Sequence, residues 1–328
     1  MARGKVFRKR RHLNPSGPTN PVSVAVSLGP PEVAAGLAVL LLAGLGVASV
    51  QDWRRREVDD RVWQTLAVAG AVVGWSALGT GAAVPLFYWA LGAIFVLEHL
   101  LPWDLPFEKR HEDLPGWIEI AGYAAVLLLL AGGIVTYGVG PSGVPVAVIA
   151  VVATVLLARL LFETNLLYGG ADAKALMVAG LLVPLDPYPL LGIPAAARPL
   201  LAVYPFAFNL LLNGALLAVV VPIAIAGWNL RNRTFDGRRG FTSYPMAVER
   251  LHEAFVWVRD PRVDPVDEDL ATSEEDRDLR IRLQGELRVR GLTEVWVTPQ
   301  LPFLLPLLAG AVTALLFGNL LFDLAALL

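Results

Sequence analysis

The chain has no cysteine among its 328 residues. This absence excludes disulfide frameworks, thiolate nucleophiles and zinc sites with cysteine ligands. Histidine is scarce as well: the chain has only His12, His99, His111 and His252, and no two of them have the spacing of a metal-binding pair on one helix face. We therefore expect neither a metal nor a cofactor.

Charge is the second property in short supply. Asp, Glu, Lys and Arg make up 17% of the residues, against roughly 25% in soluble domains. Four stretches contain none of them, namely residues 62–97, 120–158, 199–230 and 295–322. Each is longer than the ~20 residues that cross a lipid bilayer. The composition therefore excludes an ordinary soluble globule and predicts a membrane protein with several spans, and nothing in it favours nucleic acid as a partner.

Glycine and proline divide the apolar stretches into about eight predicted transmembrane helices. They lie at 33–50, as two helices within 62–97, as two within 120–158, as a short helix from 172 past 184, within 203–227, and within 301–324. The fold class predicted from this pattern is an all-α polytopic membrane protein.

A polar stretch, residues 229–298, separates the last two predicted spans and is long enough for a small cytoplasmic α+β subdomain. Its pattern predicts a helix at 248–255, strands at 255–258 and 294–297, and a solvated acidic loop at 264–278. The chain thus divides into a basic amino tail (1–32), a membrane domain (33–228), the polar subdomain (229–299) and a final transmembrane helix (300–328).

The placement of charge predicts which ends of the helices share a face of the membrane. The turns at 79–84 and 138–145 are uncharged, whereas 52–61, 98–119, 159–174 and the residues from 231 onward are rich in charge, so the charged set should face the cytoplasm. This topology places the basic amino tail outside, which conflicts with its charge. We favour an upstream extension before about Val22 that the working protein lacks.

Two aspartates mark the candidate site. Asp52 directly follows the first predicted span, and Asp172 stands where the fifth gives way to the sixth, behind Gly169 and Gly170. Four spans lie between the two aspartates, so both should reach the cytoplasmic face. The glycines are expected to permit backbone conformations that a side chain would forbid and the close approach of another chain. Two adjacent carboxylates share a proton, so that one activates water while the other protonates a carbonyl oxygen, which is aspartic-protease chemistry.

Three segments resemble motifs of one family, the type IV prepilin peptidases, and in particular its archaeal preflagellin and prepilin peptidase branch. The first is Asp-x-x-x-Arg-x-(Ile/Val)-x-(Asn/Asp), matched by Asp52, Arg56, Val58 and Asp60; the second is Gly-x-Gly-Asp-x-Lys, matched by Gly169, Asp172 and Lys174. Ala171 replaces the second glycine, which points to the archaeal branch. The third is the segment 294–303, which resembles the start of the last span in archaeal members.

The resemblance implies a membrane-embedded aspartic endopeptidase of the cell membrane that removes short basic leader peptides from archaellin and type IV pilin-like precursors. It implies Asp52 and Asp172 as catalytic residues, supported by Arg56, Gly169, Gly170 and Lys174. Acidic side chains are expected to attract the basic leader, namely Asp59, Asp60, Glu108, Glu112 and Asp113.

Other interpretations of the same residues stay open. The carboxylates could carry protons or cations in a transporter, or the chain could be an inactive membrane scaffold for the polar subdomain. Asp52 could pair with Arg55 or Arg56 at the interface, and Asp172 could cap a helix. Asn209 and Asn213 have helical spacing and are expected to hydrogen-bond a neighbouring helix.

Overall fold

The computed structural model describes residues 31–78, 83–100, 116–140, 142–167, 169–185, 204–263 and 275–327. Most of the predicted amino tail, residues 1–30, and the predicted turn at 79–82 lie outside this described part. The protein is mostly helical, with a small sheet near its carboxyl end.

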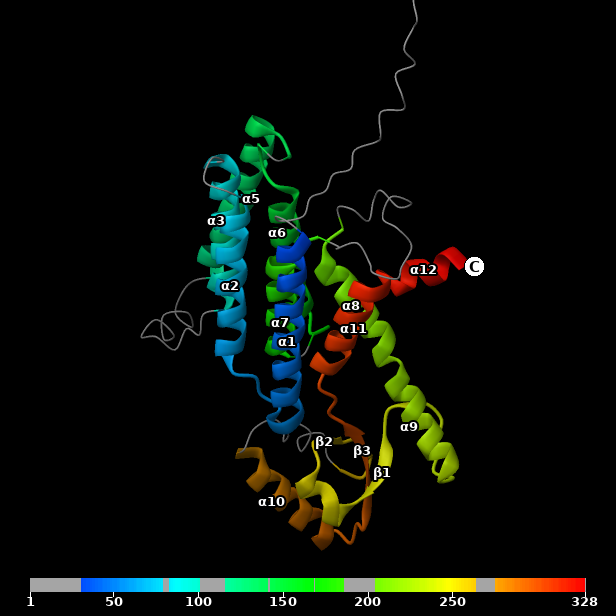
Figure 1. Ribbon diagram of the computed structural model, residues 1–328. Helices are drawn as coiled ribbons and strands as arrows, with labels where there is room; N and C mark the ends of the chain where they lie inside the picture. The colour runs from blue at the N-terminus through cyan, green and yellow to red at the C-terminus, as the bar shows by residue number, and fades with distance from the viewer. Residues whose placement is uncertain are drawn as a thin grey trace, which may run out of the picture.

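Six helices form the first part of the bundle (Figure 1). They are α1 (Pro31–Arg55), α2 (Asp60–Leu78), α3 (Ala83–Leu100), α5 (Gly116–Tyr137), α6 (Val146–Glu163) and α7 (Gly170–Leu182). Both predicted hairpins are present, and the turn of the second is built on two positive-φ glycines, Gly138 and Gly140.

The short helix α7 lies at the centre of the bundle. It packs against α1, α2, α3, α6, α8 (Phe206–Ala218) and α11 (Leu304–Phe317). Every residue from Asp172 to Leu182 except Lys174 is buried. At ~1.5 Å per residue, a helix of 13 residues is shorter than the ~30 Å hydrocarbon core. Its apolar sequence is therefore explained by burial among the other helices.

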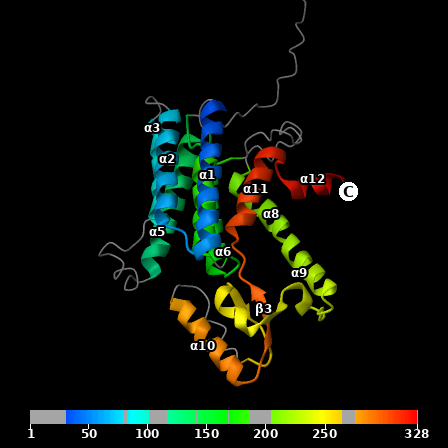
Figure 2. The same ribbon diagram turned by 60° about the horizontal axis from the view of Figure 1, so that its bottom comes forward.

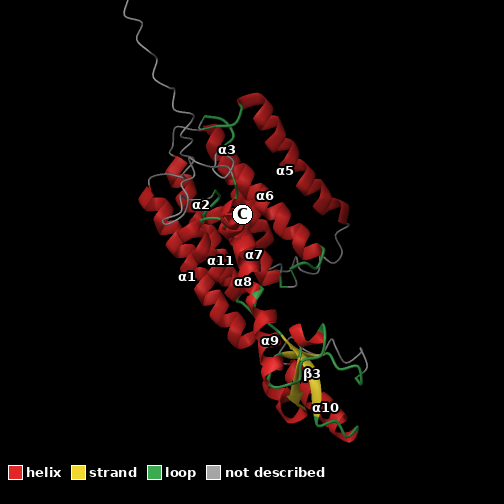
Figure 3. Ribbon diagram, turned by 90° about the vertical axis from the view of Figure 1, so that its right-hand side faces the viewer, coloured by secondary structure: helices red, strands yellow, loops and turns green. Residues whose placement is uncertain are grey.

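The prediction of eight spans is only partly supported. Among the described residues, five segments are long and apolar enough to cross a membrane: Glu32–Arg55, Ala83–Leu100, Ile120–Tyr137, Val146–Glu163 and Phe206–Arg231. The segments predicted as the second, sixth and eighth spans are helical, as α2, α7 and α11, but do not meet this measure. Helix α5 lies at the edge of the bundle (Figure 3) and exposes an apolar surface, with Val135 87% exposed, as a lipid-facing helix does.

Two of the predicted spans are interrupted. The seventh consists of α8 (Phe206–Ala218) and α9 (Val220–Arg231). Pro222 accounts for the break, because its ring clashes with the carbonyl four residues earlier, that of Ala218. The predicted final helix over 301–324 is wrong as a single element: α11 (Leu304–Phe317) ends at Gly318, whose φ is 83°, and α12 (Leu320–Leu327) follows in a new direction (Figure 1).

Buried asparagines stabilise this second break, and the prediction that they bond a neighbouring helix is confirmed. The side chain of Asn319 donates to Oδ1 of Asn209, and Nδ2 of Asn213 donates to the carbonyl of Gly318 over 2.8 Å. The backbone N–H of Leu320 donates to Oδ1 of Asn213 over 3.0 Å. These bonds satisfy backbone groups that the change of direction leaves without helical partners.

The polar subdomain lies beyond the ends of α1 and α9 (Figure 2). It contains the 3-10 helices η3 (Arg239–Phe241) and η4 (Val248–Glu253), the strands β1 (Tyr244–Ala247), β2 (Val256–Val258) and β3 (Glu294–Pro299), and α10 (Glu275–Val289). The sheet is antiparallel in the order β1-β3-β2. The predicted strands are confirmed as β2 and β3, and the predicted helix is a 3-10 turn. The prediction of an acidic loop is wrong for residues 275–278, which begin α10, and its earlier part lies outside the described residues.

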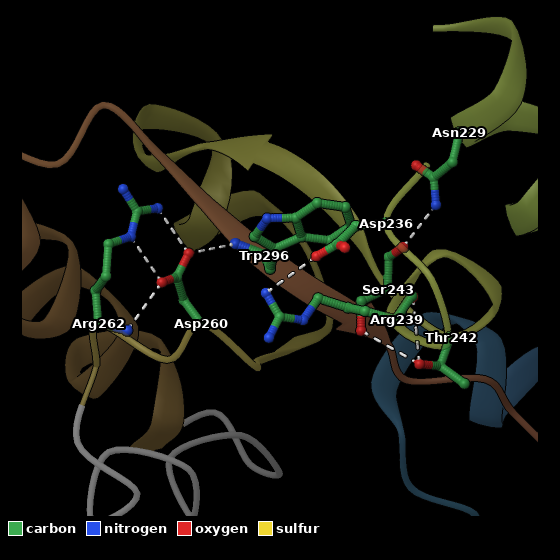
Figure 4. Close-up of polar contacts among 8 residues, drawn as sticks. All are labelled: Asn229, Asp236, Arg239, Thr242, Ser243, Asp260, Arg262 and Trp296. Atoms are coloured by element: carbon green, nitrogen blue, oxygen red, sulfur yellow. Dashed lines mark hydrogen bonds and ion pairs between the residues drawn. The ribbon is translucent and has the colours of Figure 1, made fainter. Parts of the chain in front are cut away.

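An ion pair between the buried Asp260 and the more exposed Arg262 fixes β3 to the chain that follows β2 (Figure 4). Nε and Nη2 of Arg262 donate to the two carboxylate oxygens of Asp260 over 2.8 and 2.7 Å. The backbone N–H of Trp296 also donates to Asp260, over 3.0 Å. Hydrogen bonds from the Arg262 side chain and from the backbone N–H groups of Arg262 and Trp296 lower the pKa of Asp260 to about 2.

Candidate active site

Asp52 lies inside α1, three residues before its end, and not beyond the first span as the sequence pattern indicates. Its carboxylate is half-buried and accepts a hydrogen bond from the backbone N–H of Leu304, the first residue of α11. Ser49 Oγ, on α1, donates to the carbonyl of the same Leu304 over 3.1 Å. The carboxylate is thus held at a helix N-terminus, where negative charge is favoured.

Asp172 lies in the first turn of α7 and is only 7% exposed. The N-cap of this helix is Gly169, whose carbonyl accepts the N–H of Asp172 over 3.1 Å. The interpretation of Asp172 as a helix cap is therefore wrong. Its side chain makes no cap hydrogen bond, so the carboxylate is available for another interaction.

The fold brings Asp52 and Asp172 together although 119 positions separate them in the sequence. The charge of Asp52 acts directly on the buried carboxyl of Asp172, because the end of α1 and the beginning of α7 lie against each other at one end of the bundle. Two carboxylates in such proximity do not ionise together easily, and the pair tends to share a proton.

Gly169 provides the space that the Asp172 side chain occupies. A Cβ atom at position 169 would lie 2.6 Å from Oδ2 of Asp172, which is too close for any pair of atoms that do not bond. The backbone of Gly169 is extended, with φ −94° and ψ 123°, and neither glycine has a positive φ. The expectation of special backbone conformations is therefore wrong, and the atoms that approach Gly169 closely are those of the Asp172 side chain of the same protein. A Cβ at Gly170 would meet only a ring carbon of Phe162, at 3.9 Å.

An ion pair joins the two sequence motifs. Nζ of Lys174, on α7, donates to Oδ1 of Asp60, the first residue of α2. The side chains are 27% and 32% exposed, so the pair lies at the rim of the bundle. The preceding residue, Asp59, accepts the N–H of Arg61 at the start of α2 over 2.9 Å. Of the acidic residues expected to attract a basic leader, Asp59 and Asp60 thus already have partners, and Glu108, Glu112 and Asp113 lie outside the described residues.

Arg56 immediately follows α1 and has a left-handed backbone, with φ 61°. Its guanidinium carbon lies 4.9 Å from the ring centre of Phe255, in the polar subdomain, and 5.9 Å from that of Trp53. Its charge acts on Asp52, but it forms no ion pair within 4.0 Å with any residue in the described part of the chain. The sequence interpretation of a direct Asp52–Arg56 pair is therefore replaced by an interaction over a longer distance.

Three further residues belong to the surroundings of Asp52: Ser49, Phe255 and Leu304. Sequence reasoning did not identify them, because Phe255 and Leu304 have no reactive side chain and Ser49 is a single hydroxyl inside an apolar stretch. One signal pointed toward Leu304, since it directly follows the segment 294–303 that resembles the family. As for metal sites, no three His, Cys, Asp or Glu side chains gather anywhere in the described ranges.

The model of a protein family described as Archaeal Peptidase A24 C-terminus Type II matches residues 240–320. This match supports an archaeal prepilin or preflagellin peptidase family. The matched segment of this peptidase family contains neither Asp52 nor Asp172, but it includes Phe255 and Leu304, which contact the end of α1. No curated protein and no solved structure matches the chain.

Proposed function

We propose that the protein is an aspartic endopeptidase that cuts short basic leader peptides from archaellin and type IV pilin-like precursors, with Asp52 and Asp172 as its catalytic residues. The observation that carries this proposal is the packing of α1 against α7, which places Asp52, near the end of α1, close enough to Asp172, in the first turn of α7, for the charge of one to act on the other. The family match, which supports a peptidase role in general, points the same way.

The reaction needs one water and one shared proton. The ionised carboxylate takes a proton from water while the oxygen of that water attacks the peptide carbonyl carbon, and the protonated carboxyl donates its proton to the carbonyl oxygen. Collapse of the tetrahedral intermediate then breaks the C–N bond, and a proton passes to the leaving nitrogen. No other reactant is required.

The place of the pair suits a precursor with an apolar segment after the cleaved bond. That segment can stay in the bilayer beside the bundle, while the polar leader reaches the carboxylates at the rim. The charge pattern of the sequence supports a cytoplasmic location for this rim. We also propose that the membrane domain (33–228) and the polar subdomain (229–299) carry the activity together. Helix α11 returns the chain from the subdomain to the bundle.

No observation favours the transporter alternative. Proton- or ion-carrying carboxylates lie along a path through the bundle, whereas Asp52 lies near the end of α1 and Asp172 in the first turn of α7.

The test is cleavage of a precursor with a basic leader by the purified full-length protein in liposomes. Asp52→Asn and Asp172→Asn should each lose at least a thousandfold in kcat, because removal of either member of an acid–base pair removes the whole mechanism. Asp236→Asn is the matched control, since this carboxylate is 66% exposed in the polar subdomain. Cleavage that persists in either dyad variant refutes the proposal.

A further inference from the structure

Arg56 combines three features that the proposed reaction does not use. Its backbone is left-handed at a position where helices usually place glycine, which costs a residue with a side chain about 1 kcal/mol. Its guanidinium is packed on an aromatic ring from a distant part of the chain. Two of its nitrogens, Nε and Nη1, are buried without a hydrogen-bond partner among the described residues.

Hydrogen bonding therefore does not explain the position of this side chain. The guanidinium is held by stacking on Phe255, which is a favourable contact for arginine, and its charge acts on Asp52. An unpaired, partly buried cation close to one carboxylate of an interacting pair makes the two carboxylates different.

The other charged groups around Asp52 do not provide the same field. Among the described helices, α2, α7 and α11 make the extensive contacts with α1. Helix α11 has no charged side chain. Helices α2 and α7 contribute Asp60 and Lys174, which form an ion pair with each other, Asp172 itself, and Arg61, whose side chain is exposed. Among the described residues, Arg56 is the cation whose charge acts on Asp52.

The polar subdomain holds Arg56 and the other contact of Asp52 as one unit. Phe255 stacks on Arg56, and its carbonyl accepts the N–H of Gln300 over 3.0 Å. Gln300 lies four residues before Leu304, whose N–H donates to Asp52. The chain before β2 and the chain after β3 are thus bonded to each other where both meet the end of α1.

We propose that Arg56 is a positioning residue, docked by Phe255 of the polar subdomain, that keeps Asp52 the ionised member of the pair and leaves the shared proton on Asp172. This inference rests on the proposed function. Asp52 is then the base that activates water, which agrees with its half-exposed position, and Asp172 is the acid, which agrees with its burial.

The experiment is the pH dependence of kcat/KM for Arg56→Gln, Arg56→Lys and the control Arg55→Gln, an exposed neighbour. Loss of the positive charge makes the base harder to ionise, so the acidic limb of the Arg56→Gln profile should move up by about one pH unit. At pH values below the limb, this shift lowers kcat/KM tenfold. At higher pH the difference from the unmodified protein disappears. Arg56→Lys keeps the charge and should keep the limb, as should Arg55→Gln.

Phe255→Leu tests the role of the subdomain without changing any charge. It should move the limb in the same direction by a smaller amount, whereas Phe241→Leu, at a ring that is 48% exposed, should not. If Arg56→Gln does not fold, the pH profiles of Phe255→Leu and Arg56→Lys test the role of Arg56 instead.

A limb that stays in place in Arg56→Gln, or a loss that is equal at all pH values, overturns the inference. Asp52→Asn and Asp172→Asn belong in the same series. If both are inactive while the limb of Arg56→Gln is unmoved, only the role of Arg56 is wrong. If either one cleaves, the proposed function itself is wrong.

Discussion

Replacement of Gly169 by alanine should displace the carboxylate of Asp172. The new methyl group would lie 2.6 Å from Oδ2, whereas ordinary contact begins at 3.4 Å, so the oxygen has to retreat by about 0.8 Å. The backbone needs no change, because its extended φ and ψ suit any residue. The substitution therefore acts on the position of one oxygen and on little else.

A shift of this size in a catalytic group costs on the order of 10- to 100-fold in rate, which corresponds to about 1.4 to 2.7 kcal/mol of transition-state stabilisation. The loss should fall on kcat, with KM nearly unchanged, because the acid acts on the reacting bond and does not hold the precursor. Initial rates of precursor cleavage in liposomes measure both constants.

Gly170→Ala is the matched control. Its methyl group would meet only a ring carbon of Phe162 at 3.9 Å, so activity should stay within about twofold of the unmodified protein, because no atom of the site moves. Thermal melting in detergent checks that both variants fold. The reasoning is refuted if Gly169→Ala retains the original kcat, or if Gly170→Ala loses as much as Gly169→Ala.

Three other predictions follow from the contacts. Asp60→Lys and Lys174→Asp should each lower kcat/KM, and the double swap should recover part of it, with a coupling energy of about 1 kcal/mol in a double-mutant cycle. Asp260→Asn should lower the free energy of hydrogen-exchange protection of β3 by about 1 to 2 kcal/mol at neutral pH. This value allows for solvent screening, because Arg262, the partner of Asp260, is exposed. The pKa of Asp260 is lowered to about 2, so this difference is complete above about pH 4 and disappears as the pH falls toward 2. Asn213→Leu should reduce stability by about 1 kcal/mol, seen as a lower Tm in detergent, because it leaves two backbone groups at the start of α12 without partners.

From simple physics, the sequence pattern predicted that both aspartates reach the same face of the membrane. Charged side chains stay out of hydrocarbon, so an even number of spans returns the chain to the same face. Among the described residues, four helices lie between the two aspartates, namely α2, α3, α5 and α6, and three of them meet the length and hydropathy measure for a span. The argument itself depends only on how often the chain reverses. It required no knowledge of packing.

The direction of the chain inside an apolar stretch was beyond such reasoning. The uncharged residues 295–322 contain most of β3, all of α11 and the start of α12, and α11 and α12 are similarly apolar. The change of direction depends on Gly318 and on amide groups of α8, which are more than 100 positions away for Asn213. A long-range hydrogen bond of this kind leaves no mark in local composition.

The same limit explains why Phe255 and Leu304 were not identified as parts of the site. One contributes a ring face and the other a backbone N–H, and neither property depends on a reactive side chain. Both residues lie in the segment that matches the peptidase family, whereas the aspartates do not. The matched segment therefore meets Asp52 through contacts with the end of α1, so an alteration that separates the subdomain from α1 should change catalysis while leaving both aspartates in place.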